Sequence, residues 1–164
     1  MKLAFTPALA CALLAVSVFA ASPASADNAV ISCGAPIKST VKTQYNQEFT
    51  TTSTTYVNVP KALVTVNVPK GQTQCVKVRF WTTLTCTVVN ANDHCYIKVN
   101  DSLTPLLWVP AAAAYSSDTK GSVHGFEWAT RLSEGSHVLQ MKASANNGTT
   151  LNMSSWVLDV ETAK

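Results

Sequence analysis

Hydrophobic and polar residues alternate with a period of two along most of the chain after residue 48. The clearest run is 76–84, where Val76, Val78, Phe80 and Leu84 occupy even positions and charged residues fall between them. Such alternation is typical of β-strands with one buried face. The pattern predicts strands at 49–59, 61–68, 74–89, 95–103, 105–110, 123–132, 136–145 and 150–161, and a long loop at 111–122.

Turn-forming residues separate these runs. Pro60 and Pro69 bracket the second strand, because proline cannot donate a hydrogen bond to a sheet. In the last strand the apolar phase changes from odd positions, at Leu151 and Met153, to even positions from Trp156 onward. One extra residue restores the alternation, so the pattern predicts a β-bulge near 154–155.

About eight regularly spaced strands and no amphipathic helix predict an all-β fold. The expected architecture is an antiparallel two-sheet sandwich, jelly-roll-like, in one domain spanning 49–164. Residues 27–48 are expected to form an N-terminal arm. The side chains expected to fill the core together are Phe80, Leu84, Ile97, Val99, Phe126, Trp128, Leu139, Met141, Trp156 and Leu158.

Residues 1–26 have the three parts of a cleaved signal peptide. Lys2 supplies the positive charge, residues 9–20 the apolar segment, and Ala24 and Ala26 the small residues of the cleavage site. The apolar segment is too short to span a bilayer. We therefore expect a secreted or periplasmic protein that does not span the membrane.

Four cysteines follow the leader, and an even number in an exported chain predicts two disulfides. By strand phase, Cys86 and Cys95 both lie on buried faces, and the turn-forming residues 90–93 separate them. We expect them to pair across a hairpin, which leaves Cys33 to pair with Cys75. A zinc site using His94 and Cys95 is the alternative.

Composition and motifs give little support for catalysis or cofactors. The formal net charge is +3 and 13% of residues are charged, which does not predict a nucleic-acid partner. No catalytic residues, metal ions or cofactors are assigned, although the oxygen-rich stretches 90–93 and 100–102 leave calcium open. No Gly-x-Ser-x-Gly motif occurs. A small secreted hydrolase centred on His124 and Glu127 remains the enzymatic alternative.

Aromatic residues give the best indication of function. Strand phase directs Trp81 and Arg79 away from the core on one strand, and Tyr96 and Lys98 on the next. If those strands pair, the four side chains form one ligand-binding patch for carbohydrate or for an envelope or extracellular protein. The alternative is that the N-terminal arm or the loop 111–122 covers this face.

The end of the chain resembles the last two strands of C1q/TNF-like jelly-roll domains and of many uncharacterised secreted bacterial proteins. The residues that carry the resemblance are 132–140 and 151–160, together with Phe80, Cys86, 95–99 and Asp101. The resemblance covers about residues 50–161 and implies the jelly-roll fold. It also makes a self-associating homo-oligomer a third functional class, although the collagen-like stalk of C1q is missing.

Overall fold

The computed structural model describes residues 31–44, 47–87, 93–103, 113–115, 118–146 and 148–164. These residues form strands and connections, and none of them belongs to a helix that could cross a membrane. The strands are β1 (Pro36–Gln44), β2 (Phe49–Thr51), β3 (Val57–Val68), β4 (Gln74–Thr87), β5 (Cys95–Asp101), β6 (Ala113–Tyr115), β7 (Asp118–Leu132), β8 (Gly135–Ala145) and β9 (Thr150–Ala163).

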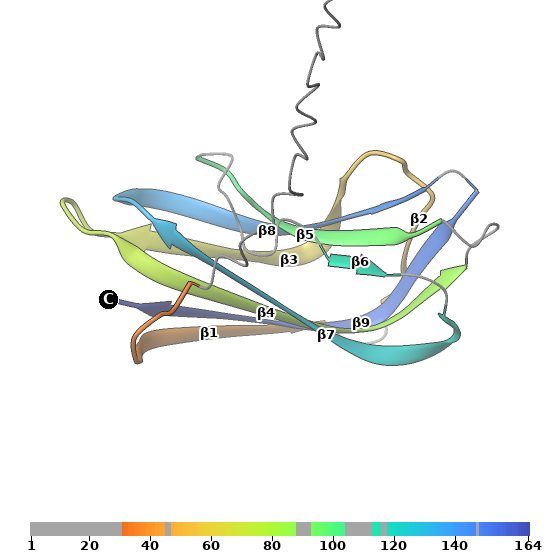
Figure 1. The fold of residues 1–164 in the computed structure, drawn as a ribbon, viewed down its shortest axis with the longest axis horizontal. Coiled ribbons are helices and arrows are strands. Elements are labelled where there is room, and N and C mark those ends of the chain that lie inside the picture. The colour runs from red at the N-terminus through yellow and green to blue at the C-terminus, as the bar shows by residue number, and fades with distance from the viewer. Residues whose placement is uncertain (1–30, 45–46, 88–92, 104–112, 116–117, 147) are drawn as a thin grey trace, which may run out of the picture.

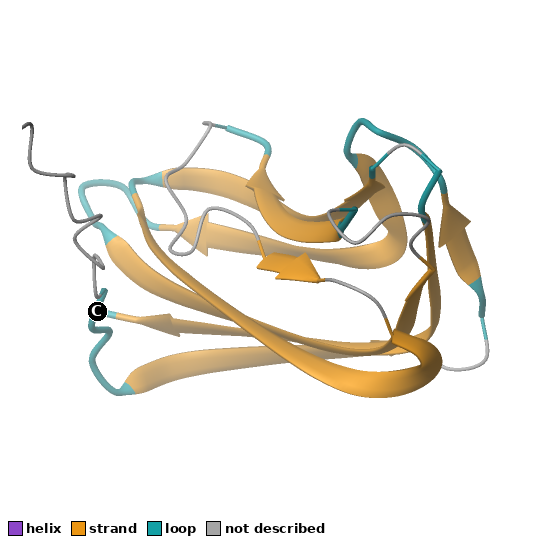
Figure 2. Cartoon of the chain, turned by 45° about the vertical axis from the view of Figure 1, so that its right-hand side comes forward, coloured by secondary structure: helices purple, strands orange, loops and turns teal. Residues whose placement is uncertain are grey.

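The strands form two antiparallel sheets that face each other, as Figures 1 and 2 show. The five-stranded sheet has the order β1-β9-β4-β7, with β2 also paired to β9. The four-stranded sheet has the order β3-β8-β5-β6. The predicted all-β sandwich is therefore confirmed.

Strand pairing is nested in the way that defines a jelly roll. The strands β5 and β6 pair with each other, and around them β4 pairs with β7, β3 with β8, and β1 with β9. The chain is thus a long folded ribbon wound so that successive strands mostly change sheets. This winding decides which residues share a surface.

The core lies between the inner faces of the two sheets. Of the ten predicted core residues, nine are buried in one cluster, and Phe126 packs against that cluster while partly buried. Trp128 is fully buried near the middle of β7, beside Phe126, with ring centroids 5.9 Å apart. Period-two alternation therefore predicted the inner faces correctly.

The predicted break at Pro60 is wrong, because β3 runs through it from Val57 to Val68. The pairing register with β8 shifts between Asn58 and Leu63, and Lys61 has a φ of 60° in this bulge. The strand β3 lies at the edge of its sheet, where a proline without an N–H group is tolerated. A bulge there replaces the expected strand end.

Three other boundaries differ from the prediction. The expected strand 49–59 is divided, because β2 joins β9 in one sheet and β3 starts in the other. The expected loop 111–122 contains β6 and the start of β7. The expected N-terminal arm contains β1, which pairs with β9 along most of its length. The predicted leader, the turn at 90–92 and the strand at 105–110 lie outside the described residues.

Both predicted disulfides are present, Cys33–Cys75 and Cys86–Cys95. The inward direction of Cys86 and Cys95 was predicted correctly, since both are fully buried. The predicted hairpin is wrong: β4 pairs with β7 and β9, whereas β5 pairs with β6 and β8. The Cys86–Cys95 bond therefore joins the two sheets, and Cys95 has no thiol left for the zinc alternative.

The predicted bulge in the last strand is confirmed. Thr83 on β4 faces Ser155, and the next residue, Leu84, faces Met153, so that Ser154 is left out of the ladder. The extra residue keeps Met153 and Trp156 both on the core side, where both are buried. A local change of phase in the sequence thus located a tertiary feature.

Candidate functional site

The predicted four-residue patch does not form. Trp81 and Arg79 lie on the outer face of the five-stranded sheet, and Tyr96 and Lys98 lie on the outer face of the four-stranded sheet. The prediction assumed that β4 and β5 are neighbours, but the chain crosses between sheets after β4. The structure therefore offers two separate surfaces on opposite sides of the sandwich.

Trp81 is partly exposed, with 38% of its surface open to solvent. It lies between Gly125 on β7 and Val157 on β9, the residues that face it in the two ladders. A Cβ atom added to Gly125 would lie 2.9 Å from both Cδ1 and Nε1 of the indole. The indole therefore rests on the bare backbone of Gly125, and any larger residue there would push it away.

A shallow hollow adjoins the indole. We call this surface the Trp81 face and define it by the outward residues that line the hollow: Trp81, Thr83, Val123, Ser155 and Val157. Val123 is 71% exposed, and the Ser155 hydroxyl donates a hydrogen bond of 3.2 Å to Oγ1 of Thr83. The Trp81 face thus combines a flat aromatic ring, exposed apolar side chains and hydroxyl groups.

Arg79 holds a charged cluster next to the Trp81 face. Its Nε donates to Glu127 on β7 at 2.9 Å, and its Nη1 donates to Glu161 at 2.8 Å and Asp159 at 3.3 Å on β9. The hydrogen bonds that Arg79 donates to Glu127 and Glu161 raise the pKa of Arg79 above its ordinary value. Three carboxylates already satisfy this cation, so Arg79 braces three strands.

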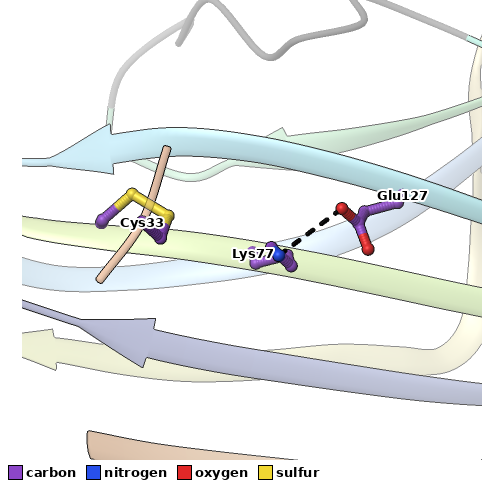
Figure 3. The surroundings of a disulfide bond; sticks show 4 residues. Cys33, Lys77 and Glu127 are labelled. Carbon is purple, nitrogen blue, oxygen red and sulfur yellow. Dashed lines mark ion pairs between the residues drawn. A yellow bond between two sulfur atoms is a disulfide. The ribbon is translucent and has the colours of Figure 1, made fainter. Parts of the chain in front are cut away.

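The N-terminal segment is fastened to the same outer face, but further along it. Figure 3 shows the Cys33–Cys75 disulfide near Lys77, which forms an ion pair of 3.7 Å with Glu127. Cys75 is six residues before Trp81 on β4, a separation of about 20 Å along a strand. From Pro36 the arm continues as the edge strand β1, in which Thr43 pairs with Val157, so its described residues lie beside the Trp81 face and do not cover it.

The outer face of the four-stranded sheet carries Tyr96 and Lys98 with partners that the sequence did not indicate. Lys98 places Nζ 3.9 Å from the ring centroid of Tyr56, a cation–π contact. In the β5–β8 ladder, Lys98 faces Lys142 and Tyr96 faces Ser144. We call the surface made by Tyr56, Tyr96, Lys98 and Lys142 the lysine face.

Tyr56 is shielded at the edge of this surface. Burial raises the pKa of its phenol above the ordinary value, an effect that a hydrogen bond with Ser144 partly offsets. The residue reaches the lysine face because the connection from β2 to β3 crosses between sheets just before it. Tyr56 fell within the expected strand 49–59 but was not singled out, and in the structure it lies just before β3.

The histidine and carboxylate of the hydrolase alternative are not brought together. His124 faces Thr82 and Glu127 faces Arg79 in the β4–β7 ladder, so the two side chains leave opposite faces of β7. His124 instead shares a hydrogen bond of 2.6 Å with the hydroxyl of Ser122. Glu127 belongs to the Arg79 cluster. The predicted pairing of His124 with Glu127 is therefore wrong.

His137 has a structural place in the core and is only 1% exposed. Its Nε2 lies 2.9 Å from the carbonyl oxygen of Ser133, which only accepts, so Nε2 carries a proton. Its Nδ1 lies 2.8 Å from Oδ2 of Asp101, also buried, within hydrogen-bond distance. The pair ties the end of β5 to the start of β8.

Within the described residues, no group of three or more histidine, cysteine or acidic side chains is arranged to hold a metal ion. The oxygen-rich stretch 100–102 is instead used within the fold. The Asn100 side chain donates to the carbonyl oxygen of Asp101, and the Ser102 hydroxyl accepts from the N–H of Val138. The other half of the calcium alternative, 90–92, lies outside the described residues.

Known proteins add no functional information. No protein-family model matches the chain, and no curated protein matches it either. The resemblance to C1q/TNF-like and secreted bacterial proteins therefore stays a prediction, and the function is inferred from the Trp81 face and the lysine face themselves.

Proposed function

We propose that this chain is an exported, non-enzymatic binding module whose Trp81 face binds the ring of a sugar. The observation that carries the proposal is the placement of the partly exposed Trp81 indole on the backbone of Gly125. Because residue 125 is a glycine, the indole of Trp81 has a defined position against the strand. An aromatic ring held in this way is a preformed platform for a ligand.

The chemistry of the Trp81 face fits a carbohydrate. The C–H groups on one side of a sugar ring pack on a flat aromatic surface, while its hydroxyls need polar partners. Thr83 and Ser155 place hydroxyl groups directly beside the indole, and Val157 widens its apolar surface. Single exposed apolar residues are common in proteins, but Trp81 together with Val123 and Val157 makes a contiguous patch.

Export from the cytoplasm is consistent with a sugar-binding function. Residues 1–26 have the pattern of a cleaved leader, and the two disulfides are compatible with an oxidising compartment outside the cytoplasm. The Cys33–Cys75 bond also holds the N-terminal segment against the outer face that carries Trp81. Cell-envelope and extracellular polysaccharides are the sugars that such a protein meets.

The test is an array of neutral oligosaccharides probed with the mature chain and with Trp81→Ala. We expect the substitution to weaken binding by about 1 kcal/mol or more, roughly fivefold, as at an interface hot spot. Trp81→Phe keeps a flat ring and should retain most of the affinity. Because the indole is outside the core, the denaturation midpoint of Trp81→Ala should stay close to that of the unaltered protein.

Ile37→Ala is the matched control, since Ile37 is another exposed apolar residue, on edge strand β1. Its affinity for the sugars should equal that of the unaltered chain. Equal loss in both variants, or unchanged binding by Trp81→Ala, would overturn the proposal. So would unfolding of Trp81→Ala, because Trp81 would then be a packing residue. Capture of an extracellular protein through Trp81 in place of any sugar would show that the face binds protein.

A further inference from the structure

Two lysines lie side by side on the four-stranded sheet without a counter-charge. Lys98 on β5 and Lys142 on β8 face each other directly in the ladder. Neither makes an ion pair with a described residue. Like charges at directly opposed positions of an antiparallel pair are destabilising, so this arrangement has an energetic cost in the free protein.

Two cations on the outer face of the five-stranded sheet do have acidic partners. There Arg79 contacts three carboxylates, and Lys77 pairs with Glu127. Lys77 and Arg79 thus have carboxylate partners, whereas Lys98 and Lys142 pair with no acidic side chain among the described residues. The unpaired lysines create a local positive potential suited to a negatively charged ligand.

The surroundings of the two lysines restrict the kind of ligand. Lys98 lies over the ring of Tyr56, which fixes the position of its ammonium group. Tyr96 is the next outward residue on β5, and the ring of His94 lies 6.2 Å from that of Tyr96. Aromatic rings therefore lie alongside the charged pair, which suits a ligand whose rings have one apolar side and carry acidic groups.

From these observations we propose that the lysine face binds an acidic polysaccharide, with Lys98 and Lys142 together receiving a carboxylate or sulfate group carried on one sugar ring. Opposed residues of an antiparallel pair have Cβ atoms about 5 Å apart, so one anionic group reaches both ammonium groups. The bound anion removes the repulsion between the lysines. Tyr56 holds the ammonium group of Lys98 in place, and Tyr96 contacts a neighbouring sugar ring.

This site is independent of the Trp81 face, because the two lie on opposite outer surfaces of the sandwich. The first test measures binding of oligogalacturonate, which carries carboxylates, and dextran sulfate, with neutral dextran as the reference. We expect the acidic polymers to bind and neutral dextran not to bind at the lysine face. Affinity should fall as salt is added, because the contacts are ionic.

The variant that tests the site is Lys98→Gln/Lys142→Gln, which should bind acidic polymers at least tenfold more weakly. Lys70→Gln, in the exposed turn between β3 and β4, is the control for a change of net charge and should bind normally. Lys98→Gln/Lys142→Gln should weaken acidic-polymer binding by the same factor in a chain that also carries Trp81→Ala. That result keeps failure of this site distinct from failure of the Trp81 face.

A second measurement does not depend on choosing the right polymer. Sodium sulfate should raise the thermal midpoint of the unaltered chain more than that of Lys142→Gln, because only the unaltered chain has the repelling pair. Equal midpoint shifts, together with unchanged polymer affinity in the double variant, would overturn the proposal. Binding to vesicles of acidic phospholipid without binding to any acidic polysaccharide would also overturn it.

Discussion

Trp81 and Gly125 form a matched pair across β4 and β7: the indole occupies the space where a side chain at Gly125 would lie. The two residues face each other in the ladder, so the contact is fixed by strand register. It explains how a large aromatic side chain on the outside of the sheet can lie directly against the backbone of the neighbouring strand. The orientation of the Trp81 side chain therefore depends on a residue 44 positions later in the chain.

Gly125→Ala should therefore displace the Trp81 indole while leaving the sheet intact. Its added Cβ would lie 2.9 Å from two indole atoms, which is closer than van der Waals contact allows. We expect changed tryptophan fluorescence, at least threefold weaker sugar binding, and a denaturation midpoint that moves little. Unaltered sugar affinity in Gly125→Ala would show that the contact between the indole and Gly125 is irrelevant to binding.

Trp128→Ala should be the most damaging of the core truncations. Trp128 is fully buried, and removing a buried tryptophan typically costs about 3–5 kcal/mol of unfolding free energy. That is a large part of the usual stability of a domain, about 5–15 kcal/mol. Chemical denaturation measures the loss.

Trp128→Phe separates packing from hydrogen bonding at the same position. Nε1 of Trp128 has no hydrogen-bond partner among the described residues, so the phenylalanine variant loses packing volume and no hydrogen bond. Its loss of stability should be clearly smaller than that of Trp128→Ala. Equal losses in the two variants would mean that the indole nitrogen has an essential partner.

Replacing both Cys86 and Cys95 by serine should destabilise the sandwich by about 3 kcal/mol, as loop entropy predicts for a cross-link spanning so few residues. The bond joins the two sheets inside the core, so its loss also leaves two polar hydroxyls buried there. Urea denaturation of the oxidised protein and of the double variant gives the difference.

Mass mapping of unreduced peptides checks the connectivity directly. Peptides containing Cys86 and Cys95 should appear linked, and those containing Cys33 and Cys75 should appear linked as a second pair. A Cys75–Cys86 or Cys33–Cys95 linkage would contradict both disulfides of the structure.

Alkaline pH should destabilise the protein in part through Tyr56. Burial raises the pKa of its phenol in the folded state, so above about pH 10 the unfolded chain releases this proton more readily than the folded chain. Stability from this group is complete below that pH and is lost as pH rises through the folded-state pKa.

Tyr56→Phe isolates the contribution, because it keeps the ring beneath Lys98 and removes the ionisable hydroxyl. The variant should lose less stability than the unaltered chain between neutral and strongly alkaline pH, as followed by denaturation. The absorbance titration should also lack one late tyrosinate transition. Identical alkaline loss in both proteins would place Tyr56 in open solvent.

Much of this protein is determined by the sequence alone, because a period of two is a local property. Alternation identified the inward faces of β4, β5, β8 and β9, and the change of phase before Trp156 located the bulge at Ser154. The phases of Cys86 and Cys95 likewise predicted that both side chains point inward, although the hairpin through which they were expected to pair does not form. Each inference used residues whose relative orientation is set by the backbone of a single strand.

Only the tertiary structure decided which strands are neighbours. Alternation tells which side of a strand is buried and says nothing about which strand lies beside it. The crossing between β4 and β5 therefore separated Trp81 from Tyr96, which the sequence had placed together. The same long-range pairing gave Arg79 its carboxylates from β7 and β9 and set Lys98 against Lys142. These contacts join residues more than 40 positions apart, and they depend on how the whole ribbon is wound, because only the shared burial of both sheets selects one winding.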